Sequence, residues 1–409
     1  MQHDENPSEE LFARLCTSKY FGGFVYQNPK FTQGSEAEAG DVVVWVRDWL
    51  VIFEVIWRSP TAGPKTKRFV KRIGEKRDQL LTDFNIYANS EMAISMTNEQ
   101  GEATEYDHDQ FNERTTRGVV LVDAPGIVDR LHYDTVRLTV EAPHPIAVMT
   151  RSDFETLLSE ADTVADLGLY LGDRHRFLQE MLYEDPGPFL QLGDQFEQEL
   201  VGHYKLFDNT FNMASWRESA NKGFWYRYQV ERSADIARRD RENKGSELLD
   251  GLISAIRTHN RPDSLTIQPA WELALFTRRE RAALNATIQN KYDRLMATGR
   301  EQQFAIMNFH TRCWDVFYLY QGVDREFFRA EAQRMADRKM WIECALNDFQ
   351  LSVFCFAIRY SSLGLGDIDE VVMTVSDAHK WPTITCEQLE EAQQYFAGMT
   401  SKKPIVEFP

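Results

Sequence analysis

Two apolar runs near the N-terminus interrupt an otherwise polar stretch of sequence. Residues 42–46 read Val-Val-Val-Trp-Val and residues 50–57 read Leu-Val-Ile-Phe-Glu-Val-Ile-Trp, with Arg47-Asp48-Trp49 between them. β-Branched and aromatic residues dominate both runs, and each run is too short for a buried helix. They predict a hairpin of two strands that is covered on both faces, because the apolar residues are continuous rather than alternating.

Helical patterns lie on either side of this hairpin. Asn6, Pro7 and Glu9 stand where an N-cap, a first helical residue and a capping-box acid would stand, and they predict a helix over about residues 7–17. From Arg68 onward apolar residues recur at helical spacing while basic residues fall on another face, which predicts an amphipathic helix with a basic side. The apolar positions of that helix are Phe69, Ile73, Leu80, Phe84 and Tyr87.

The remainder of the first half is expected to complete an α/β domain. Strands are predicted at residues 118–123, 135–140 and 145–149, and a capping box at Ser152–Glu155 opens helices that run to about residue 182. Asp185-Pro186-Gly187-Pro188 is a dense turn signal and predicts a domain boundary. The expected domains are therefore residues 1–184 and 189–409, which suits a length beyond the ~250–300 residues that one core reaches.

The second half is expected to be a helix-rich α/β domain. Helical patterns run from about residue 190 to 300, and a further helix is expected over about residues 326–345. A last helix opens at the capping box Thr385–Gln388. Strands are predicted at residues 304–309, 314–320, 351–359 and 370–375.

Net charge, targeting signals and cysteine spacing limit the classes of protein to which this chain could belong. The formal net charge of −17 argues against nucleic acid covering the whole surface. Residues 65–77 are an exception, with seven basic side chains against the single acid Glu75, a local net charge of +6. A cationic leader, an apolar window of ~18 residues and a CxxC cysteine pair are all missing. These features predict a cytoplasmic protein with five reduced cysteines and no membrane association.

Two acidic residues mark the hairpin as a candidate for chemistry. Asp41 opens the first apolar run, and Glu54 lies inside the second, where a charge is costly unless it has a partner or a metal. Carboxylates on adjacent strands supply the hard oxygen ligands that Mg²⁺ or Mn²⁺ prefers. Such an ion, together with a nearby cationic side chain, promotes the cleavage of phosphodiester bonds.

At these residues the chain resembles the PD-(D/E)XK nuclease superfamily, in which an Asp opens one strand, an Asp/Glu-x-Lys triplet lies on the next and a helix with a Gln follows. The resemblance covers about residues 7–180. It implies a restriction-endonuclease-like mixed sheet flanked by helices, with Asp41 and Glu54 holding Mg²⁺ or Mn²⁺. It also implies Glu10 as an additional acidic ligand, Gln79 beside the site, and a setting in bacterial nucleic-acid defence or repair.

The sequence departs from that family at the triplet lysine, which is Ile56 here. Two replacements are conceivable: Arg58, on the same strand face as Glu54, and Lys71, from the following helix. Arginine handles protons poorly but clamps phosphate well, so Arg58 would change the role. Three interpretations stay open: an active nuclease, a catalytically inactive pseudo-nuclease that binds nucleic acid or serves as a scaffold, and coincidence in an unrelated α/β protein.

The basic side of the helix is the expected surface for nucleic acid, with DNA favoured over RNA. A solvated helix face is the alternative interpretation, and a protein partner or a homo-oligomer is also left open. The residues expected to contact nucleic acid are Lys67, Arg68, Lys71, Arg72, Lys76 and Gln79.

Overall fold

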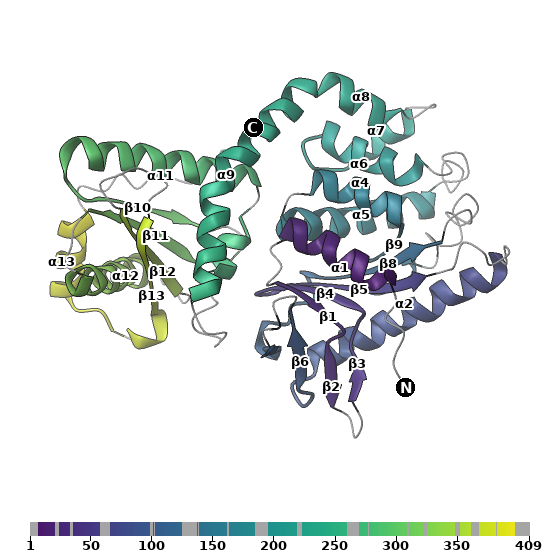
Figure 1. The fold of residues 1–409 in the computed structure, drawn as a ribbon, viewed down its shortest axis with the longest axis horizontal. Coiled ribbons are helices and arrows are strands. Elements are labelled where there is room, and N and C mark those ends of the chain that lie inside the picture. Colours follow the sequence, from purple (N-terminus) through teal and green to yellow (C-terminus); the bar gives the residue numbers. More distant parts are fainter. Residues whose placement is uncertain are drawn as a thin grey trace. The chain divides into compact units, whose positions relative to one another are not determined.

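The chain forms two compact units, Met1–Asp240 with Pro262–Leu265 and Arg241–Arg261 with Thr266–Pro409. Both combine strands and helices, so the predicted mixed α/β class is confirmed (Figure 1). Within the part of the chain that the structure describes, no helix is long and apolar enough to cross a membrane. This computed structural model describes residues 7–20, 24–32, 36–57, 66–98, 101, 103–124, 137, 139–161, 163–184, 195–218, 223–259, 270–276, 278–308, 311–321, 325–347, 352–360, 368–381 and 383–396.

A five-stranded mixed sheet organises the first unit, in the order β1-β4-β5-β8-β9. β4 and β5 form the predicted antiparallel hairpin, with Val43 opposite Ile52, whereas β5, β8 and β9 run parallel. All of β4 is buried, and β5 is buried as far as Ile56, as expected for continuous apolar runs. The strands are β1 (Val25–Gln27), β4 (Val42–Val46), β5 (Trp49–Trp57), β8 (Thr116–Asp123) and β9 (Ile146–Thr150).

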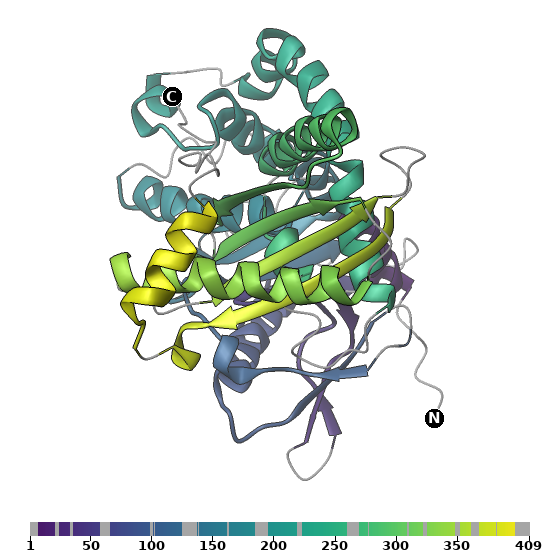
Figure 2. The same ribbon diagram turned by 90° about the vertical axis from the view of Figure 1, so that its left-hand side faces the viewer.

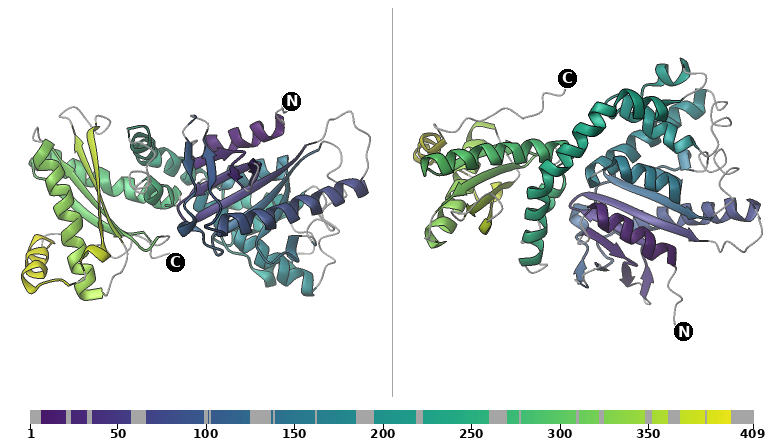
Figure 3. Two further views of the ribbon diagram at one scale, coloured as in Figure 1. Left: turned by 90° about the horizontal axis from the view of Figure 1, so that it is seen from below. Right: turned by 45° about the horizontal axis from the view of Figure 1, so that its top comes forward.

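Helices cover both faces of this sheet. On one face lies α2 (Thr66–Ala88), whose Leu80 and Phe84 pack over Gly118 of β8; the left view of Figure 3 looks onto this face. On the other face Phe154 contacts both Phe53 of β5 and a phenylalanine of α1. Because side chains alternate along a strand, Glu54 points away from Phe53 and towards α2. The helices of the second face are α1 (Pro7–Tyr20), α4 (Arg151–Glu160) and α5 (Val164–Glu184).

A small antiparallel sheet in the order β3-β2-β6-β7 accompanies the hairpin in the first unit. Its strands are three or four residues long, too short to give a periodic pattern, and the sequence prediction missed them. The strands are β2 (Lys30–Thr32), β3 (Glu36–Glu38), β6 (Ile94–Thr97) and β7 (Ala103–Glu105).

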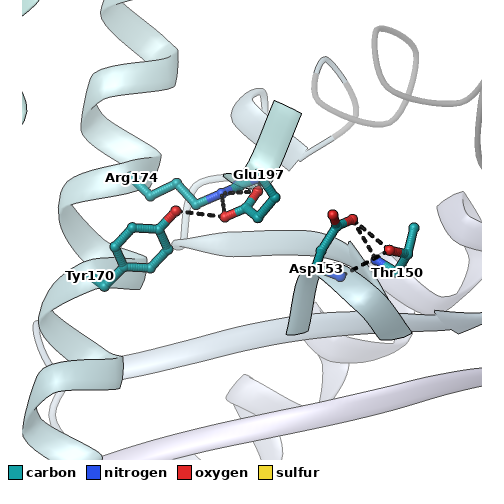
Figure 4. Close-up of polar contacts among 5 residues, drawn as sticks. All are labelled: Thr150, Asp153, Tyr170, Arg174 and Glu197. Carbon is teal, nitrogen blue, oxygen red and sulfur yellow. Dashed lines mark hydrogen bonds and ion pairs between the residues drawn. The ribbon is translucent and has the colours of Figure 1, made fainter. Parts of the chain in front are cut away.

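The helices that follow residue 188 belong to the first unit, which corrects the predicted domain boundary. Glu197 of α6 accepts hydrogen bonds from Arg174 Nη2 at 2.8 Å and from the Tyr170 hydroxyl at 2.6 Å, and all three residues are buried (Figure 4). Residues 185–188 themselves lie outside the described residues. The boundary predicted at residues 185–188 therefore falls inside the first unit. The helices concerned are α6 (Phe196–Leu206), α7 (Met213–Glu218) and α8 (Phe224–Glu231).

Two local predictions in this unit are wrong. The capping box lies two residues earlier than expected: Thr150 is the N-cap of α4, and its side chain and that of Asp153 each accept the other's backbone N–H (Figure 4). The acidic residue of the box is Asp153, three residues after Thr150, whereas the prediction paired Glu155 with Ser152. Of the strand predicted at 135–140, residues 137, 139 and 140 are helical and the others lie outside the described residues.

The second unit contains a four-stranded sheet in the order β10-β11-β12-β13. β11 and β12 are parallel and are connected through α12, while the other neighbours are antiparallel. Figure 2 looks onto this sheet with α12 lying across its strands, and Tyr292 of α11 contacts Tyr360 of β12. The strands predicted for this half are confirmed to within two residues at each end. The elements are α9 (Ser233–His259, which spans the division), α11 (Arg278–Thr298), β10 (Gln302–Met307), β11 (Trp314–Tyr320), α12 (Arg325–Asn347), β12 (Ser352–Tyr360), β13 (Ile368–Asp377) and α13 (Cys386–Phe396).

Candidate active site

Asp41 and Glu54 lie side by side on the β4–β5 hairpin. Asp41 precedes β4 directly, and the pairing of Val42 with Phe53 places it opposite Glu54. Its Oδ2 atom accepts a hydrogen bond from the backbone N–H of Val55 at 2.6 Å. Only 10% of the Asp41 side chain and 3% of the Glu54 side chain are exposed. The structure thus brings both predicted acids to one place and buries them there.

The cation between these acids comes from α2. Lys76 Nζ lies 3.2 Å from Asp41 Oδ2 and also forms a close ion pair with Glu54 Oε2. Its side chain is 28% exposed, so the ammonium group faces inward with limited access to water. Ile56, at the triplet position, is fully buried. Sequence reasoning placed Lys76 on the nucleic-acid face and missed this contact.

An open hollow of about 390 Å³ surrounds the three charged groups. Acidic side chains outnumber basic ones around it, so the local field favours a cation over an anion. Its lining residues are Glu38, Asp41, Glu54, Arg72, Glu75, Lys76 and Gln79.

Burial sets the protonation of this cluster. Burial raises the pKa of Glu54 to about 9, the negative charge of Asp41 adds to the rise, and Lys76 opposes it. Burial alone would lower the pKa of Lys76, but the carboxylates of Asp41 and Glu54 outweigh that effect and raise it. Lys76 therefore stays cationic at neutral pH. Without a bound metal ion, Glu54 takes up a proton more readily than an ordinary glutamate does.

Asp83, on the buried side of α2, interacts electrostatically with Glu54, Asp41 and Lys76, and the sequence analysis did not single it out. It is fully buried, and its Oδ1 accepts a hydrogen bond from Gln79 Nε2 at 2.9 Å. Burial raises the pKa of Asp83 to about 6. One turn further on, the Tyr87 hydroxyl donates to the carbonyl of Ala39 at 3.0 Å. The signal that could have found Asp83 is its place within the apolar stripe of the helix.

Two predicted catalytic or metal-binding residues, Glu10 and Lys71, are not brought to the hollow. Glu10 is 57% exposed and pairs with Arg14 at 3.2 Å on α1, which covers the opposite face of the sheet. Lys71 is 78% exposed and pairs with Glu75 at 3.1 Å, because it lies on the outer side of α2. Arg58 falls outside the described residues.

Only part of the predicted nucleic-acid surface can be placed. Lys67 and Arg68 belong to α2, but their side chains lie outside the described part of the structure. Arg72 lines the hollow, and its Nη1 atom lies 3.5 Å from the Trp57 carbonyl oxygen. Lys71 is exposed beside it, whereas Lys76 points inward.

Comparisons with protein-family models, curated proteins and solved structures find no match to this chain. We therefore infer the chemistry of the site from its own geometry. Among the described residues no group of three or more His, Cys, Asp or Glu side chains could hold a metal ion. The pair Asp41 and Glu54 still suits a hard divalent cation, since one oxygen of each converges on the single cationic atom of Lys76. Mg²⁺ in particular is held by one or two carboxylates with water completing its shell.

Proposed function

We propose that the first unit hydrolyses phosphodiester bonds of nucleic acid with the help of Mg²⁺ or Mn²⁺, as its resemblance to PD-(D/E)XK nucleases implies. The observation that supports this proposal is the position of Lys76, whose ammonium group contacts both Asp41 and Glu54. A cation beside two buried carboxylates is the combination that the triplet lysine would otherwise complete. Helix α2 thus provides the cationic group that Ile56 cannot provide from strand β5.

Each side chain of the hollow then has a distinct task. Asp41 and Glu54 would hold the ion, which when bound supplies positive charge beside the scissile phosphate and eases the ionisation of water. The Val55 N–H keeps the Asp41 carboxylate oriented. Lys76 has three N–H donors, so it can retain one carboxylate while donating to a phosphate oxygen whose negative charge grows during attack. Arg72, at the rim, would clamp a neighbouring phosphate.

A catalytically inactive pseudo-nuclease is the second candidate. Lys76 contacts both acids, and when Glu54 is protonated its charge balances that of Asp41, so the cluster is also a complete structural network without any metal. In that case the first unit would bind nucleic acid, or serve as a scaffold, through the exposed side of α2. Both candidates would act in the cytoplasm, in nucleic-acid defence or repair, and both favour DNA over RNA as the partner.

Glu54→Gln separates these functions, with Glu75→Gln as the matched control. Both residues line the hollow, but Glu54 contacts Lys76 inside it whereas Glu75 pairs with Lys71 at the exposed rim. We expect Glu54→Gln to abolish Mn²⁺-dependent cleavage of DNA and RNA oligonucleotides, and Glu75→Gln to retain it. Mn²⁺ at 100 times its dissociation constant should stabilise wild type by about 2.7 kcal/mol in thermal unfolding, and should not stabilise Glu54→Gln.

Two results would count against the proposal. Cleavage by Glu54→Gln at the wild-type rate would mean that the hollow is not the site. Wild type that gains no stability from Mn²⁺ and cuts no oligonucleotide would leave the pseudo-nuclease, which a direct binding measurement with the same oligonucleotides would then test.

A further inference from the structure

Gln79 lines the hollow, and one end of its side-chain amide is held by a hydrogen bond. Its side-chain nitrogen Nε2 donates to Asp83 Oδ1 at 2.9 Å, one turn further along α2. A carboxylate oxygen only accepts hydrogen bonds, so the NH₂ end of the Gln79 amide must face Asp83. The amide oxygen Oε1 is then directed away from Asp83. Gln79 lines the hollow, and because Asp83 holds the NH₂ end of its amide, the oxygen is the end left to accept a hydrogen bond from another group.

The pair is more than an ordinary helix contact. Gln289 and Asp293 make the same i,i+4 hydrogen bond at 2.9 Å, but they do so on an exposed face of α11, where the only consequence is a slightly more stable helix. Asp83 is fully buried, and burying a carboxyl group is costly where a leucine would pack instead. Asp83 also interacts electrostatically with Glu54, Asp41 and Lys76, so its carboxyl group belongs to the charged cluster, where a leucine could not replace it.

We infer that Asp83 is a positioning residue, which holds the Gln79 amide so that Oε1 accepts a hydrogen bond from the attacking water. The inference rests on the proposed function. In that reaction the water oxygen forms the new bond to phosphorus and loses a proton to solvent, while the bond from phosphorus to the leaving oxygen breaks and that oxygen takes up a proton from solvent. Phosphate oxygens carry no proton to donate, so an amide oxygen in the hollow serves the water rather than the nucleic-acid backbone. This assigns Gln79 to the chemical step instead of phosphate binding.

A cycle of substitutions tests the orientation itself. Asp83→Leu removes the anchor and lets the amide of Gln79 rotate, so kcat should fall about tenfold, the effect of one hydrogen bond, with KM nearly unchanged. Gln79→Glu alone places two carboxyl groups side by side and should also lower kcat. Gln79→Glu combined with Asp83→Leu should recover most of the loss, because both oxygens of a glutamate are acceptors and need no anchor. Asp293→Leu, which breaks the matched exposed pair, should leave kcat unchanged.

A second readout needs neither metal nor substrate. The Gln79 side-chain NH₂ signal in an NMR spectrum of the metal-free protein, identified by its loss in Gln79→Glu, should exchange slowly in wild type and rapidly in Asp83→Leu. Unchanged exchange would overturn the anchoring role of Asp83. Normal kcat in Asp83→Leu, or a double variant no better than the single ones, would overturn the role in catalysis. Wild type that cleaves nothing while the exchange result holds would instead refute the nuclease activity, and the water-orienting role with it.

Discussion

Replacing Lys76 by methionine is the sharpest test of the cluster. Methionine keeps the apolar stem of the side chain and removes only the ammonium group that contacts Asp41 and Glu54. Breaking a buried ion pair costs about 3–5 kcal/mol. Two features of the structure reduce that cost: the Lys76 side chain is 28% exposed, and Glu54, with a pKa of about 9, can take up a proton. We therefore expect a loss of about 1–2 kcal/mol in the free energy of unfolding without metal.

The same substitution should have a much larger effect on cleavage. Removing one preorganised donor from a developing negative charge lowers kcat by about 10²–10³. Lys71→Met is the matched control, since Lys71 lies on the same helix but is 78% exposed, and it should change stability by less than about 0.5 kcal/mol. Both variants would be compared with wild type by urea unfolding and by initial rates of oligonucleotide cleavage at saturating Mn²⁺.

The dependence on metal decides how the result is interpreted. Lys76→Met removes a cation that competes for the two carboxylates, so it should bind Mn²⁺ more tightly than wild type even though it cleaves slowly. If Lys76→Met cleaves as fast as Lys71→Met, Lys76 does not contribute to catalysis and serves only as a counter-ion in the metal-free protein. Weaker Mn²⁺ binding in Lys76→Met would show instead that the carboxylates need the lysine to stay in place.

Three further outcomes follow from the same cluster. Burial raises the pKa of Glu54 from 4.5 to about 9, so its contribution to stability is present below pH 4.5 and is lost as the pH rises through 9. Urea unfolding of the metal-free protein should therefore show stability that declines between these pH values, and Glu54→Gln should flatten the decline. Replacing Lys71 and Arg72 by Gln should weaken oligonucleotide binding and reduce its log–log salt slope by about two, whereas an unchanged slope would assign that face to solvent. Ile56→Lys should destabilise the protein and reduce cleavage, because Lys76 already places a cation there; a gain in cleavage would contradict that.

The sequence predicts the strands of the site better than the cation that serves it. The hairpin and the approach of Asp41 to Glu54 follow from two apolar runs and the antiparallel pairing that a short turn imposes. Lys76 was assigned to the basic face because six other basic residues surround it in residues 65–77. Yet the position lies three residues after Ile73 and four before Leu80, inside the apolar stripe. Charge outweighed periodicity in that interpretation, and periodicity was the better guide.

The predicted domain boundary and the position of Glu10 show where local signals fail. Pro186-Gly187-Pro188 is a strong turn signal, but a turn says nothing about whether the helices on either side share a core. That depends on long-range contacts such as Arg174 with Glu197, which are 23 residues apart in sequence. Glu10 lies away from the hollow for a related reason. The start of its helix was predicted well, but the face of the sheet that the helix covers is set by tertiary packing.

The buried contact of Arg174 with Glu197 determines how the protein can be divided into fragments. Arg174 and Tyr170 both meet Glu197 beyond the turn, so a polypeptide ending at residue 184 would keep an interior guanidinium and hydroxyl and lose their shared acceptor. An uncompensated interior charge of this kind costs about 3–5 kcal/mol, a large share of the stability of a single domain. A soluble fragment that carries the hollow should therefore extend at least through α6, and through α8 to keep the hydrogen bond from the Tyr228 hydroxyl to buried Glu160. Failure of a shorter fragment to fold would say nothing about the chemistry of its acids.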